Sequence, residues 1–183
     1  MGLLPGPPSA TLRPHQRGYL TYRYLIALGS NRRHQRFGRP RDVLKAALER
    51  LEEKGAAIEA AGPIMLTDPI GPSLRRYANS AAVIETVLEP GALLALLKGI
   101  EREFGRRTGG QRWTSRVLDL DIVLWSGGTF AAPGLTIPHI LFRERPFVLA
   151  PAARIAGGWR DPITGLSIRQ LHSRLTRPGT IRR

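Results

Sequence analysis

Two aspartates, Asp119 and Asp121, stand two residues apart in an otherwise apolar run. Alternate residues of a β-strand point to the same face of a sheet, so this spacing predicts that both carboxylates share one face. The same alternation assigns Val123 and Trp125 to the carboxylate face, and it assigns to the opposite face Leu118, Leu120, Ile122 and Leu124. Carboxylate oxygens arranged in this way suit Mg²⁺ that also binds phosphate oxygens. A plain solvated strand face is the alternative.

A basic segment with adjacent glycines comes just before the aspartates. It contains Arg106, Arg107, Gly109, Gly110, Arg112, Trp113 and Arg116. Guanidinium groups bind phosphates in a bidentate manner, and a loop of this kind can close over them, with the tryptophan covering the ligand. The chain has no G-x-x-x-x-G-K-[ST] motif, which excludes a Walker loop. Cations and anions in one short segment therefore predict phosphate chemistry, although the loop alone is equally explained as a solvated connection.

Another set of residues suits a flat ligand that forms hydrogen bonds. Tyr77 and Asn79 share one face of a predicted strand, which places an aromatic ring beside a carboxamide, and Phe147 is a candidate for the opposite wall. His139 follows a proline in an arginine-rich segment. No second histidine stands nearby at zinc-ligand spacing, so a structural role is the alternative reading of His139.

The elements that must carry these residues follow from periodicity and turn signals. Strands are predicted over 22–28, 57–66 (interrupted at Gly62-Pro63), 77–88 and the aspartate segment, and helices from an Asp42 N-cap to Gly55 and from Pro90 to Gly105. This order predicts an α+β fold with a ferredoxin-like βαββαβ core, a largely antiparallel sheet with helices packed on it. Segments 145–155 and 168–175 are expected to add C-terminal helices.

Length and composition favour one domain in a reducing compartment. We expect a flexible extension over 1–21, a single domain over 22–176 and a basic tail over 177–183. The chain has no apolar run long enough for a membrane span and no signal-peptide pattern at its start. Cysteine is absent, which excludes disulfides and thiolate metal sites. A cytoplasmic protein is the resulting expectation.

The formal net charge of +14 favours acidic partners, namely nucleic acid, an anionic membrane or a phosphorylated small molecule. Nearly all of the positive charge is arginine, since the only lysines are Lys45, Lys54 and Lys98. Biased codon usage explains the surface arginines equally well. The basic residues are scattered along the chain, without the block that is typical of a nucleic-acid-binding tail.

Taken together, these residues resemble the hydroxymethyl-dihydropterin pyrophosphokinases of folate biosynthesis. The matching motifs are A-L-G-S-N at 27–31, T-D-P-I-G at 67–71, Y-A-N-S-A-A-V-I-E-T at 77–86, G-R, R-W-x-x-R and L-D-L-D within 101–125, L-T-I-P-H at 135–139 and R-P-F-V-L at 145–149. They occur in the family's order and spacing and extend over about 24–155.

The resemblance implies transfer of pyrophosphate from ATP to the hydroxymethyl group of 6-hydroxymethyl-7,8-dihydropterin, giving AMP. Two Mg²⁺ ions would bind Asp119 and Asp121, and Arg106 and Arg116 would assist catalysis. The residues expected to bind ATP are Glu101, Arg107, Trp113, Arg116, Ile122, Thr136, His139 and Arg145. Those expected to bind the pterin are Thr67, Asp68, Ile70, Tyr77, Asn79, Trp113 and Phe147. Three mobile loops are implied at 32–41, 68–75 and 106–115.

The sequence departs from the family pattern at a few positions. Asp68 stands where many members have proline, and Thr108 and Gly134 stand where some have nucleotide-contacting arginines, the first of which Arg107 is placed to replace. Two other classes stay open, an RNA-binding ferredoxin-like module and a relative that binds pterin without catalysis. An RNA-binding strand would carry more aromatic residues than 77–86 does. We therefore expect a monomer that acts on ATP and pterin, with neither nucleic acid nor membrane as a partner.

Overall fold

The computed structural model of the chain describes residues 20–67, 76–105 and 117–177. Its strands are β1 (Tyr22–Ser30), β2 (Ala57–Ala61), β3 (Met65–Thr67), β4 (Tyr77–Thr86), β5 (Asp119–Trp125), β6 (Phe130–Ala132) and β7 (Leu135–Ile137). Its helices are α1 (Pro40–Glu53), α2 (Pro90–Glu103), the short 3-10 helix η2 (Phe142–Glu144), α3 (Pro146–Ile155) and α4 (Ile168–Thr176). None of the helices in these described ranges is both long and apolar enough to cross a membrane.

The main sheet has the strand order β2-β4-β1-β5, and every pairing in it is antiparallel. The expected α+β fold with a ferredoxin-like core is confirmed by this architecture. The strand expected over 57–66 with an interruption at Gly62-Pro63 forms two separate strands, β2 and β3, which both pair with β4. The break falls at Gly62-Pro63, where proline has no N–H for the ladder.

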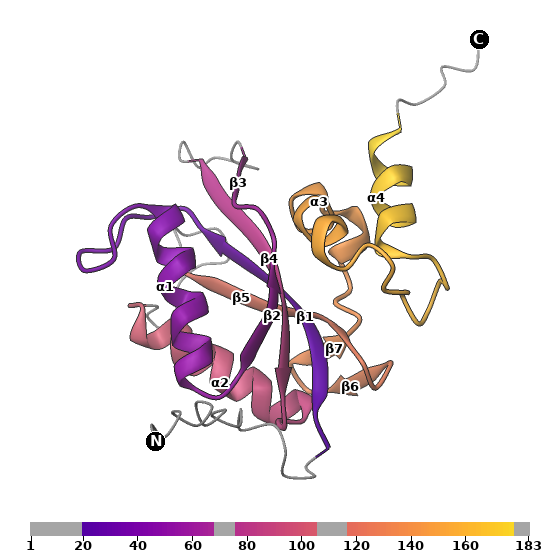
Figure 1. Cartoon of the computed structure of the whole chain (residues 1–183), viewed down its shortest axis with the longest axis horizontal. Helices are drawn as coiled ribbons and strands as arrows, with labels where there is room; N and C mark the ends of the chain where they lie inside the picture. Colours follow the sequence, from indigo (N-terminus) through magenta and orange to yellow (C-terminus); the bar gives the residue numbers. More distant parts are fainter. Residues whose placement is uncertain (1–19, 68–75, 106–116, 178–183) are drawn as a thin grey trace, which may run out of the picture.

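The two faces of the sheet are covered by different helices (Figure 1). On one face, α1 and α2 pack against Leu28, Ile84 and Leu120 in the larger core cluster. On the other face, α3 and α4 pack against Leu25 and Val83 in a smaller cluster. The smaller cluster ends at Ala81 along β4, so the sheet positions beyond Ala81 do not belong to it.

The first helix begins earlier than expected. Its N-cap is Arg39, and Pro40 occupies the first turn, so the predicted cap at Asp42 is wrong. Asp42 lies at the third helical position, from which its Oδ2 accepts a hydrogen bond from the Arg39 N–H at 3.1 Å. The expected glycine stops are confirmed, since Gly55 and Gly105 follow the two helices with positive φ.

A β-bulge interrupts the alternation of β5. Ile26 pairs with Ile122 and Leu25 with Leu124, which leaves Val123 as the extra residue. The predicted face of Trp125 is therefore wrong, because its ring packs in the larger cluster against Tyr24, with centroids 6.4 Å apart. Leu124 was also placed on the wrong face, since it lies in the smaller cluster beside α3.

Beyond the main sheet, β6 and β7 form a separate hairpin that the sequence pattern did not predict. In the loop before α1, Phe37 stacks on Phe104 with ring centroids 4.5 Å apart, so part of the first predicted loop packs against the end of α2. The expected loops at 68–75 and 106–115, most of the extension over 1–21 and most of the tail over 177–183 lie outside the described residues.

Candidate functional site

One row of residues crosses the sheet beyond the smaller core cluster, on the same face as α3. Asn79 of β4 pairs with Gly29 of β1, and Gly29 pairs with Asp119 of β5. Directly paired residues of antiparallel strands project from the same face, so the carboxamide and the carboxylate share a face on either side of the glycine. The next row, Ala81, Ala27 and Asp121, repeats the arrangement with alanine in the centre. Small residues thus separate the expected pterin side from the expected metal side.

Within the described sheet, Gly29 puts no side chain between these two sides. A Cβ atom at this position would lie 3.4 Å from Asn79 Oδ1 and 4.0 Å from Asp119 Cβ. These are ordinary van der Waals distances, so the backbone does not require glycine here for steric fit. A side chain at position 29 would instead occupy the space over β1 that separates Asn79 on β4 from Asp119 on β5.

The expected pterin-binding residues of β3 and β4 lie close together. Asn79 is 6% exposed, and its Nδ2 donates to Thr67 Oγ1 at 2.7 Å. This bond fixes the carboxamide so that Oδ1 lies over Gly29. Tyr77 pairs with Thr67 on the same face and is half-buried. The predicted common face of Tyr77 and Asn79 is confirmed by this register.

The beginning of α3 brings a cation to the carboxylates. Arg145 is the N-cap residue of α3, and its Nη1 lies 4.0 Å from Asp121 Oδ2. Both side chains are about one-third exposed, at 31% and 33%. The guanidinium carbon of Arg145 also lies 5.8 Å from the ring centroid of Phe147. The structure thus places Phe147, Arg145 and Asp121 in sequence along one edge of the site.

His139 is held beside the carboxylates through the bulge in β5. Its backbone N–H donates to the Val123 carbonyl at 3.0 Å. Its Nδ1 accepts the Leu141 N–H at 3.1 Å, so the proton of the neutral imidazole lies on Nε2. Burial lowers the pKa of His139; Asp121 and Asp119 oppose that effect, whereas Arg145 adds to it. The ring is therefore a neutral donor through Nε2 near pH 7.

Glu101 lies below the site, on the face covered by α2. Its side chain is 1% exposed, and Oε1 accepts the Leu120 N–H at 2.8 Å. Lys98 Nζ donates to the same Oε1 at 2.7 Å and to the Leu120 carbonyl at 3.2 Å. In the described sheet β5 pairs only with β1, so these two side chains bond the outer edge of β5 at the residue between the aspartates.

Two further expected ATP-binding residues differ in burial, because Ile122 is buried and Thr136 is exposed. Ile122 is 2% exposed and belongs to the larger core cluster, so a ligand contact would have to use its main chain. Thr136 is exposed on β7, and Gly134 occupies the β6–β7 turn with φ of +80°. That left-handed conformation disfavours the arginine that some family members carry at the position of Gly134.

The described part of the chain leaves several predicted residues without a structural account. Arg106, Arg107, Trp113, Arg116, Asp68 and Ile70 all lie outside the described ranges. The sequence pattern gave no role to Gly29 beyond its place in the motif A-L-G-S-N, and none to Lys98, which resembles any helix-surface lysine. The pairing of Gly29 across strands reveals the first, and the bond from Lys98 to the outer edge of β5 reveals the second.

The donor set fits a magnesium ion that is completed by substrate. Among the described residues, no three or more His, Cys, Asp or Glu side chains cluster as a metal site. Asp119 and Asp121 supply hard oxygen atoms on one half-buried face. Mg²⁺ commonly takes one or two protein carboxylates and completes its octahedron with phosphate oxygens and water. The arrangement therefore suits a metal that arrives with a phosphate ligand.

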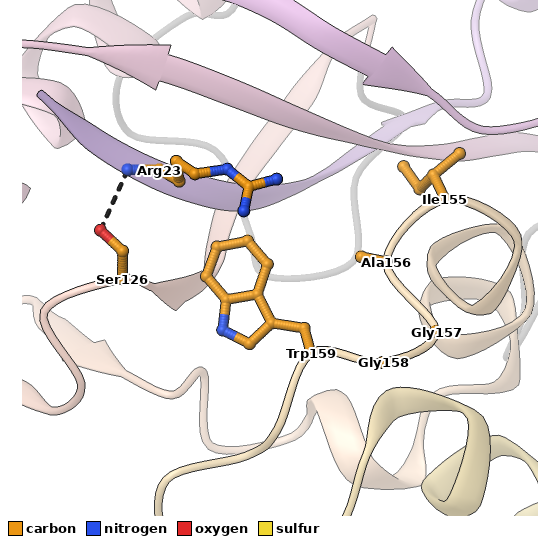
Figure 2. Close-up of a pocket in the computed structure, with 7 residues that line it drawn as sticks. All are labelled: Arg23, Ser126, Ile155, Ala156, Gly157, Gly158 and Trp159. Carbon is orange, nitrogen blue, oxygen red and sulfur yellow. Dashed lines mark hydrogen bonds between the residues drawn. The ribbon is translucent and has the colours of Figure 1, made fainter.

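A hollow of about 520 Å³ lies elsewhere on the same face of the sheet (Figure 2). It is lined by Arg23, Ser126, Trp159 and the stretch 155–158. Arg23 and Gly29 are six residues apart on β1, which corresponds to roughly 20 Å along a strand. None of the predicted site residues lines this hollow. The guanidinium of Arg23 forms an ion pair with Glu59, with Nη2 2.6 Å from Oε2.

Comparison with known proteins gives a consistent result. Residues 25–157 match the family described as 7,8-dihydro-6-hydroxymethylpterin-pyrophosphokinase. The 2-amino-4-hydroxy-6-hydroxymethyldihydropteridine pyrophosphokinase of Pseudomonas aeruginosa is 40% identical over 144 residues, which cover 76% of this chain and 84% of that protein. The enzyme of the same name from Bacillus subtilis is 39% identical over 132 residues, covering 71% and 75%.

Longer proteins contain a matching region as well. A folate synthesis bifunctional protein of Arabidopsis thaliana is 37% identical over 134 residues, which are 73% of this chain but 27% of that protein. The crystal structure of Plasmodium falciparum HPPK-DHPS with pteroate superimposes with a TM-score of 0.67 at 14% identity. The match covers 85% of this chain and 44% of the Plasmodium chain, and at this identity it supports the fold alone.

Proposed function

The chain belongs to the 7,8-dihydro-6-hydroxymethylpterin-pyrophosphokinase family, and we propose that it transfers pyrophosphate from ATP to the hydroxymethyl group of 6-hydroxymethyl-7,8-dihydropterin. The products would be AMP and the pterin pyrophosphate. The observation that carries this proposal is the row Asn79, Gly29 and Asp119 across β4, β1 and β5. It sets a carboxamide suited to a pterin edge beside a carboxylate suited to a metal-bound phosphate, with only the glycine between them in this row.

The pterin would bind on the β4 side of Gly29. Asn79 Oδ1, fixed by the bond from Nδ2 to Thr67, would accept hydrogen bonds from the N–H groups of the heterocycle. Tyr77 and Phe147, from opposite borders of the site, would stack on the two sides of the ring. A carboxamide held by a 2.7 Å bond is pre-oriented, which reduces the entropy lost when the ligand binds.

The triphosphate of ATP would bind on the β5 side. Asp119 and Asp121 would hold two magnesium ions, which supply charge neutralisation at the phosphates when bound. His139 would donate a hydrogen bond from Nε2 to a phosphate oxygen, and Arg145 would add a guanidinium contact. Because the attacking alcohol approaches a negatively charged phosphorus, these groups lower the barrier by charge stabilisation and alignment.

The remaining expectations stay predictions. The catalytic and lid roles of Arg106, Arg116 and Trp113, the nucleotide contacts of Arg107, Glu101, Ile122 and Thr136, and the pterin contacts of Asp68 and Ile70 are carried by the family resemblance. We also keep the expectation of a cytoplasmic monomer that binds neither nucleic acid nor membrane. Sedimentation of the purified protein would test the expected monomer.

The decisive experiment incubates the protein with ATP, Mg²⁺ and 6-hydroxymethyl-7,8-dihydropterin and identifies the nucleotide product. Formation of AMP in step with pterin pyrophosphate is expected, and a chelator should stop it. Formation of ADP would contradict the proposed reaction. Binding of pterin without turnover would indicate a non-catalytic relative, and tight RNA binding without turnover would indicate a nucleic-acid module.

A further inference from the structure

We propose that Asp161 is a positioning residue for the nucleotide side of the site, acting through Arg143 on the segment that carries His139 and Arg145. This inference rests on the proposed function, because the readout is ATP binding. Asp161 and Arg143 did not figure among the residues expected from the sequence to form the site. The connection emerges from the contacts of one short segment, residues 139–145, with the loop before α4.

Residues 139–145 form a tight turn with its two ligand-facing residues at its ends. The Phe142 N–H donates to the His139 carbonyl at 3.1 Å, and the Arg145 N–H donates to the Phe142 carbonyl at 3.3 Å. The bond from the His139 N–H to Val123 fixes the first end on β5. At the second end, the Arg145 carbonyl accepts from the first turn of α3. Arg143 lies in the middle, on the 3-10 helix η2.

Arg143 is held by a buried carboxylate. Its Nε donates to Asp161 Oδ2 and its Nη2 donates to Asp161 Oδ1, each at 2.8 Å. Asp161 is 0% exposed, whereas the Arg143 side chain is 24% exposed. The guanidinium carbon also lies 4.8 Å from the ring centroid of the buried Phe142. A two-point bond and a stacked ring leave the guanidinium a single orientation, which lysine cannot reproduce.

The loop that carries Asp161 is itself closed. The Asp161 N–H donates to the Leu166 carbonyl at 2.9 Å, and the Gly165 N–H donates back to the Asp161 carbonyl at 2.8 Å. Thr164 Oγ1 donates to Asp161 Oδ2 at 2.6 Å, and the Ile163 N–H donates to Oδ1 at 3.1 Å. The Asp161 carboxylate is therefore held in place by its own loop. Through its bonds to Arg143, it fixes the turn that carries His139 and Arg145.

The consequence for function is specific to one substrate. His139 and Arg145 both belong to the expected phosphate side, whereas Asn79, Thr67 and Tyr77 belong to β3 and β4. Loosening the turn should therefore weaken nucleotide binding and leave the pterin side of the sheet in place. A displacement of about an ångström at a charged contact is enough to reduce rates roughly a hundredfold.

The test compares Asp161→Asn, Arg143→Met and Arg143→Lys with wild type, using calorimetric titration of a nonhydrolysable ATP analogue with Mg²⁺. We expect the dissociation constant to rise about tenfold or more in the first two variants and less in Arg143→Lys, which keeps one contact. In steady-state assays, KM for ATP should rise while KM for the pterin stays nearly constant. A purely structural role would lower stability without separating the two substrates.

Two further variants keep the outcome clear. Arg23→Met removes another two-point bond between arginine and a carboxylate, to Glu59, at the hollow in Figure 2, and it should leave ATP-analogue binding unchanged. The double variant Arg143→Met/Asp161→Asn removes both charges of the pair and keeps a side-chain oxygen at position 161 for the Ile163 N–H or the Thr164 hydroxyl. Its loss of stability should therefore be smaller than the sum of the two single losses, while its analogue affinity stays low. Wild-type affinity in Asp161→Asn and Arg143→Met would overturn this inference alone. Absence of analogue binding by the wild-type protein would overturn the proposed function and the inference with it.

Discussion

Glu101 and Leu120 are joined by a buried hydrogen bond of 2.8 Å that runs from the backbone of β5 to a side chain of α2. Leu120 stands between the two aspartates, so the bond fixes the strand at the point where the carboxylates project from its other face. Lys98 completes the contact by binding the same carboxylate and the Leu120 carbonyl. Helix α2 thereby takes the place of a neighbouring strand at this residue.

Replacement of Glu101 should therefore lower stability. Glu101→Leu leaves the Leu120 N–H and the Lys98 ammonium without this acceptor, and a loss of about 1–3 kcal/mol in unfolding free energy is expected. Glu101→Gln should lose less, because its amide oxygen still accepts from Leu120. The matched control is Glu103→Gln, because Glu103 forms an exposed ion pair with Arg50. This change should alter the unfolding free energy by less than about 1 kcal/mol. Urea denaturation measures all three, and equal losses at 101 and 103 would contradict this assignment.

Removal of either carboxylate charge should abolish most of the activity while the fold persists. Asp119→Asn and Asp121→Asn are each expected to lower kcat by about 10²–10³ or more, because magnesium and the phosphates lose an oxygen ligand. Circular dichroism should match wild type, since both side chains are only half-buried. Asp42→Asn, on the exposed first turn of α1, is the control and should retain full activity. Undiminished turnover in both site variants would exclude the metal assignment.

A side chain at position 29 should lower the turnover without lowering the stability of the fold. Gly29→Ala places a methyl group at van der Waals distance from Asn79 and Asp119, so the fold can accept it. We expect stability to stay constant or rise by about 0.5–1 kcal/mol, because alanine restricts the unfolded chain. Turnover should nevertheless fall about tenfold or more through misplacement of the substrates. Gly91→Ala on α2, where a Cβ meets nothing within 4 Å, should leave turnover unchanged. Full activity in Gly29→Ala would contradict the proposal that the substrates occupy the space over Gly29.

Acid stability should depend on Asp161. Burial by itself would raise the pKa of Asp161, but hydrogen bonds from Arg143, Thr164 and the Ile163 amide outweigh it and hold the pKa at about 2. Because the folded pKa lies below that of an unfolded aspartate, about 3.9, the ionised group stabilises the fold above that pH. The contribution, about 2–3 kcal/mol, should disappear as the pH falls from about 4 to about 2.

Urea unfolding at a series of pH values tests this dependence. The difference in unfolding free energy between wild type and Asp161→Asn should be constant near neutrality and should narrow on acidification. Thr164→Val removes one hydrogen bond to the same carboxylate, so it should raise the pKa and shift the narrowing to higher pH. Parallel stability curves for wild type and Asp161→Asn would contradict the low pKa.

The sequence alone was enough for much of the fold and for most of the described site residues. Alternation in 77–86 and 119–122 predicted the faces of Tyr77, Asn79, Asp119 and Asp121, because strand geometry is local. Glycine after each of the first two helices predicted where these helices end, because a glycine cap at a helix C-terminus is also a local signal. The order of elements then restricted the topology, and the motifs indicated the family.

What only the tertiary structure decided depends on contacts between distant segments. The bulge at Val123 moves Trp125 to the other face, and no local pattern in β5 reports an extra residue relative to β1. The role of Gly29 emerges only when β4 and β5 flank it, and the role of Lys98 emerges only from its bond to the Leu120 carbonyl on β5. Arg143 and Asp161, 18 residues apart, meet because α3 folds back between them. Local propensity determines which way a side chain points, whereas packing determines which side chains share a site.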